Sequence, residues 1–105
     1  TIESISNDTW HTTYSFGTTY IRTIIEYDNK ENVAYAQVSA DDEYNANKFT
    51  KTLWTDKVDN SFYYCIVVRN AETLEDAKNT AGDYDVNNLT EGCGGYPWQL
   101  ITMSE

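Results

Sequence analysis

The stretch SFYYCIVVR, Ser61–Arg69, is the most apolar run of the chain and contains one of its two cysteines. β-branched and aromatic residues dominate it, and turn formers stand on both sides of it. Alternation predicts one face of Phe62, Tyr64, Ile66 and Val68, and an opposite face of Tyr63, Cys65, Val67 and Arg69. Because both faces are largely apolar, we expect a central strand that is covered on both sides. A buried helix is the alternative, but the run is short and rich in β-branched residues.

The rest of the chain shows the same two-residue period, interrupted by turn signals. The other expected strands are Asp8–Phe16, Thr18–Tyr27, Val33–Ser39, Phe49–Thr55 and Tyr96–Met103, with Thr1–Asn7 as a lead-in or an edge strand. Gly17 and the polar runs 28–32, 40–48 and 56–60 separate them. Pro97 places the last strand at an edge of the sheet or marks its first residue.

Glu72–Ala81 is the one segment that reads as a helix. Thr73 can cap it, Asp76 can complete an imperfect capping box, and Gly82 stands where a helix C′ residue belongs. Strands in hairpin order, a short late helix and a closing strand predict a mostly β fold. We expect one domain over residues 1–105, a small antiparallel β-barrel or sandwich of about six strands. A barrel can close if the last strand pairs near the first.

The two cysteines predict a disulfide between Cys65 and Cys93. Two unrelated thiols are the alternative, and a zinc site is not favoured because His11 is the only histidine. A bridge that closes a loop of about 29 residues stabilises a fold by ~3.6 kcal/mol on the chain-entropy model. It also indicates an oxidising compartment, so we expect a secreted or cell-surface protein. A chain that begins at Thr1 without an apolar leader suits a mature protein or an excised domain.

The charge of the chain limits its partners. It carries 17 acidic and 7 basic residues, for a formal net charge of −10. Nucleic acid and anionic membrane surfaces are therefore not expected as partners, since both require a basic face. No apolar stretch approaches the length of a transmembrane segment, so membrane insertion is not expected. The acidity serves solubility or, alternatively, attracts a cation or a basic partner.

Several motifs stand in a distinctive order along the chain. They are Tyr27-Asp28-Asn29, Tyr44-Asn45, Asn47-Lys48-Phe49, Trp54-Thr55, Phe62-Tyr63-Tyr64-Cys65 and Gly92-Cys93-Gly94-Gly95-Tyr96-Pro97-Trp98. Over roughly residues 20–100 this pattern resembles a group of small exported bacterial domains, found in predicted lipoproteins and surface proteins. Those domains share a YDN turn, an FxKxxWT-like strand, a YYC strand and a GCGGFPW-like tail, in which Phe often replaces Tyr96. The resemblance implies export, the disulfide and a compact β fold, and it carries no activity or catalytic residue across.

No residue pattern predicts catalysis. His11 lies in a Thr-rich strand without a serine in a nucleophile-elbow context. The acidic residues Asp41-Asp42-Glu43 and the pair Asp83 and Asp85 lie in loops, where carboxylates are usually solvated rather than arranged across a cleft. We therefore expect no enzyme activity, no catalytic residue and no cofactor.

Two weaker patterns concern metal and modification. Asp83, Asp85 and Asn87 match the first three ligand positions of a calcium loop, but the glycine and the glutamate that such a loop needs are missing. A capped turn after the helix is the simpler interpretation, and we expect no metal. Asn7 and Asn88 begin glycosylation sequons, which matter only in a host that glycosylates asparagine.

The aromatic residues are the remaining functional signal, since nine tyrosines exceed what a small core needs. The leading hypothesis is a non-catalytic extracellular module for adhesion or assembly, such as a structural or filament subunit. It would contact a surface protein or copies of itself as a homo-oligomer through a Tyr-rich β surface. One alternative is a lipocalin- or avidin-like barrel with a small-ligand pocket lined by Trp10, Tyr14, Trp54 and Tyr64. The other is a glycan-binding module.

Overall fold

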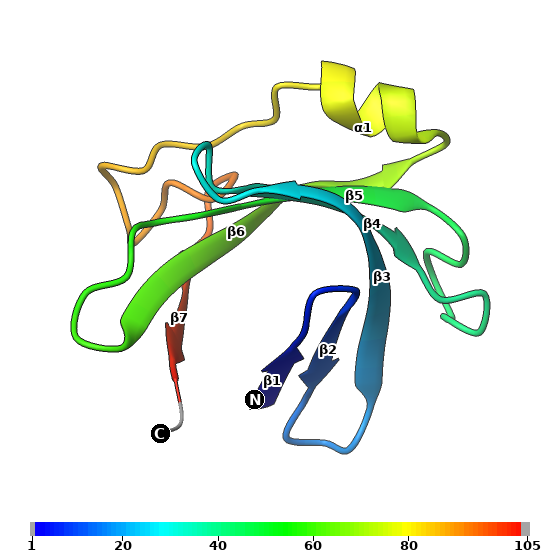
Figure 1. Ribbon diagram of the computed structural model, residues 1–105, viewed down its shortest axis with the longest axis horizontal. Coiled ribbons are helices and arrows are strands. Elements are labelled where there is room, and N and C mark those ends of the chain that lie inside the picture. Colours follow the sequence, from blue (N-terminus) through cyan, green and yellow to red (C-terminus); the bar gives the residue numbers. More distant parts are fainter. Residues whose placement is uncertain (1, 104–105) are drawn as a thin grey trace.

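A single antiparallel sheet of seven strands, each paired with the next along the chain, forms the body of the computed structural model, which describes residues 2–103 (Figure 1). The strands are β1 (Ile2–Ile5), β2 (Thr9–Thr13), β3 (Thr19–Asp28), β4 (Val33–Val38), β5 (Phe49–Trp54), β6 (Ser61–Ala71) and β7 (Gln99–Thr102), and the helix is α1 (Leu74–Asn79). The mostly β fold with one late helix is confirmed. The strand count is seven because residues 2–5 form a full edge strand on β2.

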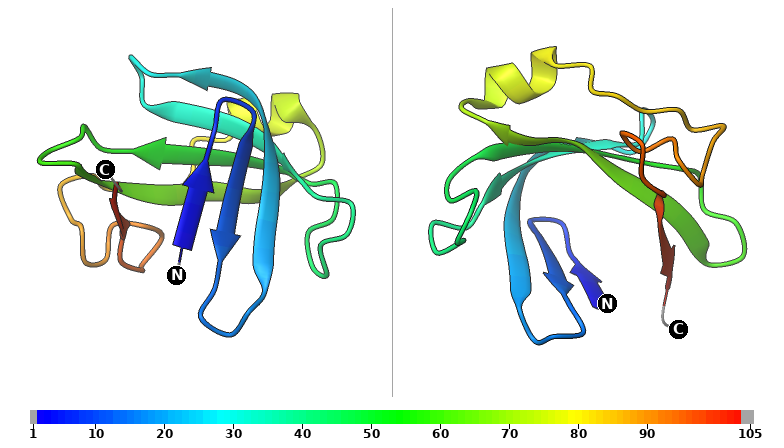
Figure 2. Two further views of the ribbon diagram at one scale, coloured as in Figure 1. Left: turned by 60° about the horizontal axis from the view of Figure 1, so that its bottom comes forward. Right: turned by 180° about the vertical axis from the view of Figure 1, so that it is seen from behind.

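The sheet coils into a nearly closed, barrel-like shape with one open side (Figure 2). Its order ends at β1 on one side and at β7 on the other, so the last strand does not pair with the first. Figure 2 shows these two short strands on opposite sides of the opening. Side chains close the interior there, because Trp10 on β2, Tyr64 on β6 and Ile101 on β7 form one buried cluster.

The strand β6 is covered on both faces, as its sequence predicts. Tyr64 faces the barrel interior and contacts Trp10, with ring centroids 5.1 Å apart. Cys65 faces outward and is bonded to Cys93, with Cα atoms 5.7 Å apart, which confirms the disulfide. The outer face is covered by α1, which packs on β4, β5 and β6, and by the irregular tail that follows it. Ala77 of α1 is completely buried in this contact.

Three predicted elements are shorter than expected. The strand predicted over Asp8–Phe16 ends at Thr13, and Phe16 lies in the following turn, 76 % exposed and stacked on Tyr14. The strand predicted over Tyr96–Met103 is limited to Gln99–Thr102, because Tyr96 still pairs with Cys93 in the tail.

The predicted helix Glu72–Ala81 is also limited, to Leu74–Asn79. Thr73 caps it as predicted, and its side chain accepts the backbone N–H of Asp76 at 3.0 Å. Its C-cap is Thr80, so Gly82 lies beyond the C′ position and makes a separate left-handed turn with φ +83°.

Candidate binding site

The barrel interior is unusually polar at its centre. Three threonines and one arginine are buried there, on three strands: Thr12 on β2, Arg22 on β3, and Thr50 and Thr52 on β5. The main apolar cluster packs toward one end of the barrel, whereas Tyr20 and Val38 are buried at and beyond the level of Arg22.

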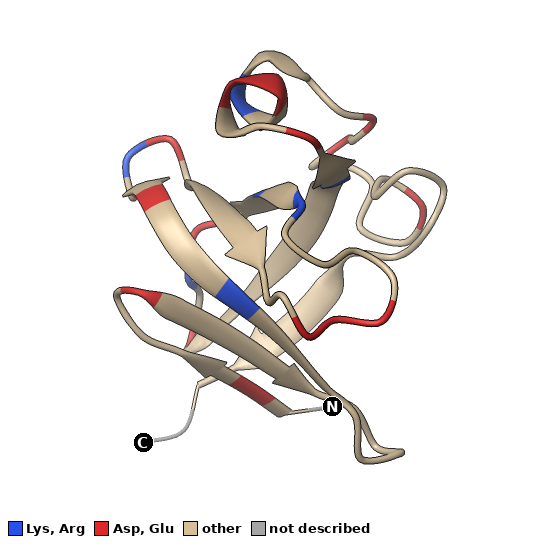
Figure 3. Cartoon of the chain, turned by 90° about the vertical axis from the view of Figure 1, so that its right-hand side faces the viewer, with Lys and Arg blue, Asp and Glu red and all other residues tan. Residues whose placement is uncertain are grey.

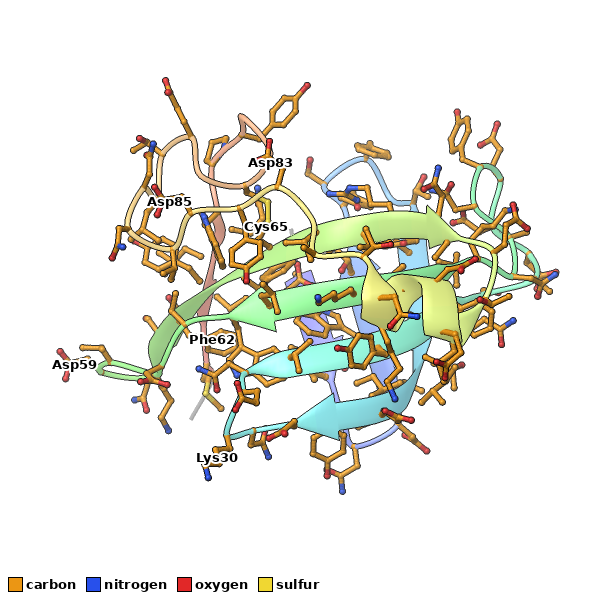
Figure 4. All side chains as sticks on the ribbon, turned by 90° about the horizontal axis from the view of Figure 1, so that it is seen from above. Lys30, Asp59, Phe62, Cys65, Asp83 and Asp85 are labelled. Atoms are coloured by element: carbon orange, nitrogen blue, oxygen red, sulfur yellow. A yellow bond between two sulfur atoms is a disulfide. The ribbon has the colours of Figure 1, made fainter. Side chains whose placement is uncertain are left out.

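A cavity of about 420 Å³ opens at the apolar end of the barrel. Four aromatic side chains line it: Trp10, Tyr27, Trp54 and Phe62. Ile5, Ile24, Ala34 and Met103 complete its apolar wall. We call this space the mouth cavity. Figure 4 places Phe62 at the end of the sheet that carries the Lys30 and Asp59 turns. The cavity also spans the open side of the barrel, because Ile5 ends β1 and Met103 follows β7.

Polar residues from three turns form the rim of the mouth cavity. Asn32 after the β3–β4 turn donates its side-chain amide to Asp56 Oδ1 at 2.9 Å, and its carbonyl accepts the backbone N–H of Trp54 at 3.1 Å. These bonds tie two neighbouring turns together beside the opening. Lys57 lies next to Asp56 on the same rim, so the charges at the entrance balance.

Arg22 is the largest fully buried side chain, with 0 % exposure. Its guanidinium carbon lies 4.7 Å from the centre of the Trp10 ring and 5.0 Å from that of Tyr20, and its Nη1 donates to Thr52 Oγ1 at 3.1 Å. Because β4 lies between β3 and β5, the side chain must cross the inner face of β4 to reach Thr52. Ala34 and Ala36 face inward there, and their small side chains leave room for it.

The charge of Arg22 has no anionic partner within the described chain. Its Nε and Nη2, and the hydroxyl of Tyr20, are buried without a hydrogen-bond partner among residues 2–103. The ion pairs in the same range are Lys48–Glu72 and Lys78–Glu26, both at the surface. Burial lowers the pKa of the Arg22 guanidinium, and burial likewise raises the pKa of the Tyr20 hydroxyl. A buried cation without a partner is costly, so this cluster is a candidate anion site.

Glu3 is a carboxylate whose charge acts on Arg22, and both of its oxygens already accept hydrogen bonds from other residues. Its Oε1 accepts Trp10 Nε1 at 2.8 Å and Thr12 Oγ1 at 2.6 Å, and its Oε2 accepts the Tyr64 hydroxyl at 3.0 Å. Burial, and then the neighbouring Glu3 charge, raise the pKa of Tyr64. Glu3 therefore joins β1 to β2 and β6 through hydrogen bonds. Its negative charge also acts to raise the pKa of the Arg22 guanidinium against the effect of burial, but no ion pair joins the two groups within residues 2–103.

The four predicted ligand-binding residues fall into two different spaces. Trp10 and Trp54 line the mouth cavity. Tyr14 and Tyr64 line a second, more polar groove of about 830 Å³ between β2, β6 and the tail. Arg22 and Glu3 were not expected in the site. The signal for Arg22 was available, because it stands in the middle of an apolar alternating run, Tyr20-Ile21-Arg22-Thr23-Ile24.

The remaining candidate residues have local structural roles. Asp83 and Asp85 lie in the tail above Cys65 (Figure 4), and Asp85 Oδ1 accepts the backbone N–H of Asn87 at 2.9 Å, as in a capped turn. No group of three or more His, Cys, Asp or Glu side chains is placed to hold a metal within residues 2–103. Asn7 is exposed at the rim of the mouth cavity, whereas Asn88 Oδ1 accepts Thr90 Oγ1 and the N–H of Glu91. His11 lies on the β2 face opposite Trp10.

Acidic residues are distributed over α1 and the loops on several sides of the molecule (Figure 3). The described part of the chain contains no helix that is long and apolar enough to cross a membrane. No family model, curated protein or solved structure matches the chain. The geometry of the interior is therefore the main indication of function.

Proposed function

We propose that this chain is a non-catalytic binding module that holds a small, mainly apolar ligand in the mouth cavity. The observation that carries the proposal is the cavity itself, about 420 Å³ with four aromatic side chains in its wall. Ligand sites are typically concave, a few hundred Å³ in volume and lined by apolar side chains with few polar groups. The structure thus favours the small-ligand alternative over contact through an aromatic surface.

The polar groups at the entrance support a selective binding site rather than a nonspecific apolar surface. The carboxylate of Asp56 is fixed by Asn32, and Asn7 and Asn29 stand on neighbouring turns. Amide groups of this kind can orient a ligand by hydrogen bonds while the aromatic wall supplies affinity.

We propose a secreted or cell-surface location for this module. The Cys65–Cys93 disulfide supports it, because structural disulfides persist in oxidising compartments. The formal charge of −10 argues against nucleic acid as a partner.

Binding of N-phenyl-1-naphthylamine, an uncharged fluorescent aromatic probe, tests the proposal. We expect saturable binding to the folded protein and a loss of at least about tenfold in affinity for Trp54→Ala, because the ring forms part of the wall. Leu53→Ala is the matched control, since the preceding residue faces the opposite side of β5. Circular dichroism establishes that both variants are folded. Equal affinity of the two variants, or no saturable binding to the native protein, would contradict the proposal.

Assembly or adhesion is a second candidate function, favoured by a different observation. The two strands beside the open side expose apolar residues, with Ile2 of β1 71 % and Leu100 of β7 57 % exposed. Unpaired edge strands readily accept a strand from another chain. Light scattering over a range of protein concentrations tests this candidate, and a monomer at every concentration would exclude self-assembly.

A further inference from the structure

Four buried donor atoms have no hydrogen-bond partner within residues 2–103, of which one is Trp98 Nε1. The other three lie together, and two of them belong to one edge of Arg22. Nε and Nη2 carry parallel N–H bonds along one edge of the planar guanidinium, and both atoms are without a partner. This is the edge that donates two hydrogen bonds at once to a carboxylate. The third donor, the Tyr20 hydroxyl, belongs to a ring whose centre is 5.0 Å from the guanidinium carbon.

This donor group adjoins the mouth cavity. Trp10, which lines the cavity, has its ring 4.7 Å from the Arg22 guanidinium carbon. Ala34, also in the cavity wall, is paired with Thr52, the residue that accepts Nη1. The Trp10 ring therefore separates the cavity from the Arg22 guanidinium.

We infer that the ligand of the mouth cavity is a carboxylic acid, whose carboxylate reaches Arg22 and Tyr20 while its apolar body lies among the aromatic side chains. The inference rests on the proposed function, because it assigns a chemical class to the ligand of the same cavity. A carboxylate supplies the missing negative charge and accepts both N–H bonds of the Arg22 edge. Glu3 does not fill this role, since its oxygens accept Trp10, Thr12 and Tyr64.

Entry of the acid requires a local side-chain movement, because Arg22 is 0 % exposed. Rotamer changes at binding sites are common even where the backbone stays fixed. The open side of the barrel makes such a movement feasible, since β1 and β7 are not joined by backbone hydrogen bonds across it.

The test compares three acids, octanoate, 2-naphthoate and indole-3-acetate, each with its methyl ester, by isothermal titration calorimetry at pH 7.5. Each ester keeps the apolar body and removes the charge. For the native protein we expect at least one acid to bind about tenfold or more tightly than its ester, as for a hydrogen bond to a charged group. In Arg22→Met this preference should fall to within about twofold, because the unbranched apolar side chain keeps most of the volume but none of the donors. The matched control is Lys78→Met, which removes one positive charge from α1 on the outer face of the sheet.

Tyr20→Phe keeps the inference testable if Arg22→Met does not fold. We expect it to weaken binding of the acid by about threefold or more and to leave the ester unchanged, because only a hydroxyl is removed. Equal binding of acids and esters to the native protein would overturn the carboxylate inference and leave the proposed function intact. Binding of neither would reject both. An acid preference that survives Arg22→Met and Tyr20→Phe would show that the charge is bound elsewhere.

Discussion

Tyr64 on β6 donates its hydroxyl to Oε2 of Glu3 on β1 at 3.0 Å, across the side of the barrel where the sheet is open. The two residues are 61 positions apart and lie in strands that are not neighbours in the sheet. Glu3 also accepts Trp10 and Thr12, so one carboxylate satisfies three donors of the interior. This contact does what the missing strand pairing does in a closed barrel, because it fixes β1 against β6.

Glu3→Ala should destabilise the fold by at least about 1–3 kcal/mol, because it leaves the Trp10, Thr12 and Tyr64 donors without their acceptor. Urea unfolding followed by tryptophan fluorescence measures the change. Ser4→Ala is the control on the same strand, exposed and outside this network, and should stay within about 0.5 kcal/mol of the native protein. An equal effect of the two substitutions would show that Glu3 does not close the barrel.

Tyr64→Phe should change how stability depends on alkaline pH. The pKa of Tyr64 is raised in the folded state, so the unfolded chain loses this proton first as the pH rises above about 10. The unfolded state then binds fewer protons, and the free energy of unfolding of the native protein falls with pH in that range. In Tyr64→Phe this contribution is absent, so the variant is less stable at pH 7 but loses less between pH 9 and pH 11.

Urea unfolding at pH 7, 9 and 11 measures the alkaline effect. The control is Tyr44→Phe, which removes one hydroxyl from an exposed ring. A Tyr64→Phe curve parallel to the native curve at all three pH values would contradict the assignment.

Ala36→Leu should destabilise the protein by about 1–3 kcal/mol, since overpacking a filled interior forces side chains from their preferred rotamers. Ala36 is buried on the face of β4 that the Arg22 side chain crosses on its way to Thr52. Ala81→Leu, at an exposed position after α1, is the control for the added side chain. Thermal unfolding compares the two. A native-like midpoint for Ala36→Leu would mean that the space above β4 is not filled by Arg22.

The sequence predicted the strands well because alternation and turn residues are local signals. Ser61–Arg69, its two faces and the disulfide followed from residue types alone. Trp10 and Trp54, two of the four residues predicted to bind a ligand, line the mouth cavity, and their role in binding stays a prediction.

The polar interior was not predicted, because it depends on contacts between distant strands. Arg22 donates a hydrogen bond to Thr52, 30 residues away in the sequence. Glu3 accepts one from Tyr64, 61 residues away. Local patterning also cannot show the irregularity between Ile24 and Glu26 in β3. That bulge shifts the alternation, so Tyr27 pairs with inward-facing Ala34 and reaches the mouth cavity.

Gly82→Ala should cost more stability than Gly17→Ala, although both glycines have a left-handed φ, +83° and +95°. A Cβ on Gly82 would lie 2.7 Å from Cβ of Val67, whereas a Cβ on Gly17 would meet nothing within 4 Å. Both variants carry the backbone strain of about 1–2 kcal/mol, and only Gly82→Ala adds a steric conflict of about 1–3 kcal/mol. Chemical denaturation of the pair measures the difference. Equal losses would indicate that the tail can move away from β6 at no cost.

The disulfide should matter most for the segment that it ties to β6. The tail from 81 to 91 is mostly exposed, and its hydrogen bonds join it to other residues of the tail, such as Asp85 N–H to the Gly92 carbonyl at 2.7 Å and Gly92 N–H to the Asn88 carbonyl at 2.7 Å. We therefore expect the double variant Cys65→Ser with Cys93→Ser to loosen residues 72–95 before the rest of the fold. The total loss should be about 3–4 kcal/mol on the chain-entropy model.

Native-state hydrogen exchange resolves which part opens first in the double variant. The amides of Asp85 and Gly92 should lose protection, while those of β3 and β4, which pair on both sides within the sheet, should keep it. Dithiothreitol treatment of the native protein should reproduce the pattern. Because it breaks the bridge without introducing serine, it separates the loss of the bridge from the effect of a serine at the buried position 65. Uniform loss of protection across sheet and tail would mean that the bridge stabilises the barrel as a whole. Unchanged protection of the tail would mean that contacts such as Trp98 N–H to the Leu89 carbonyl hold it without the bridge.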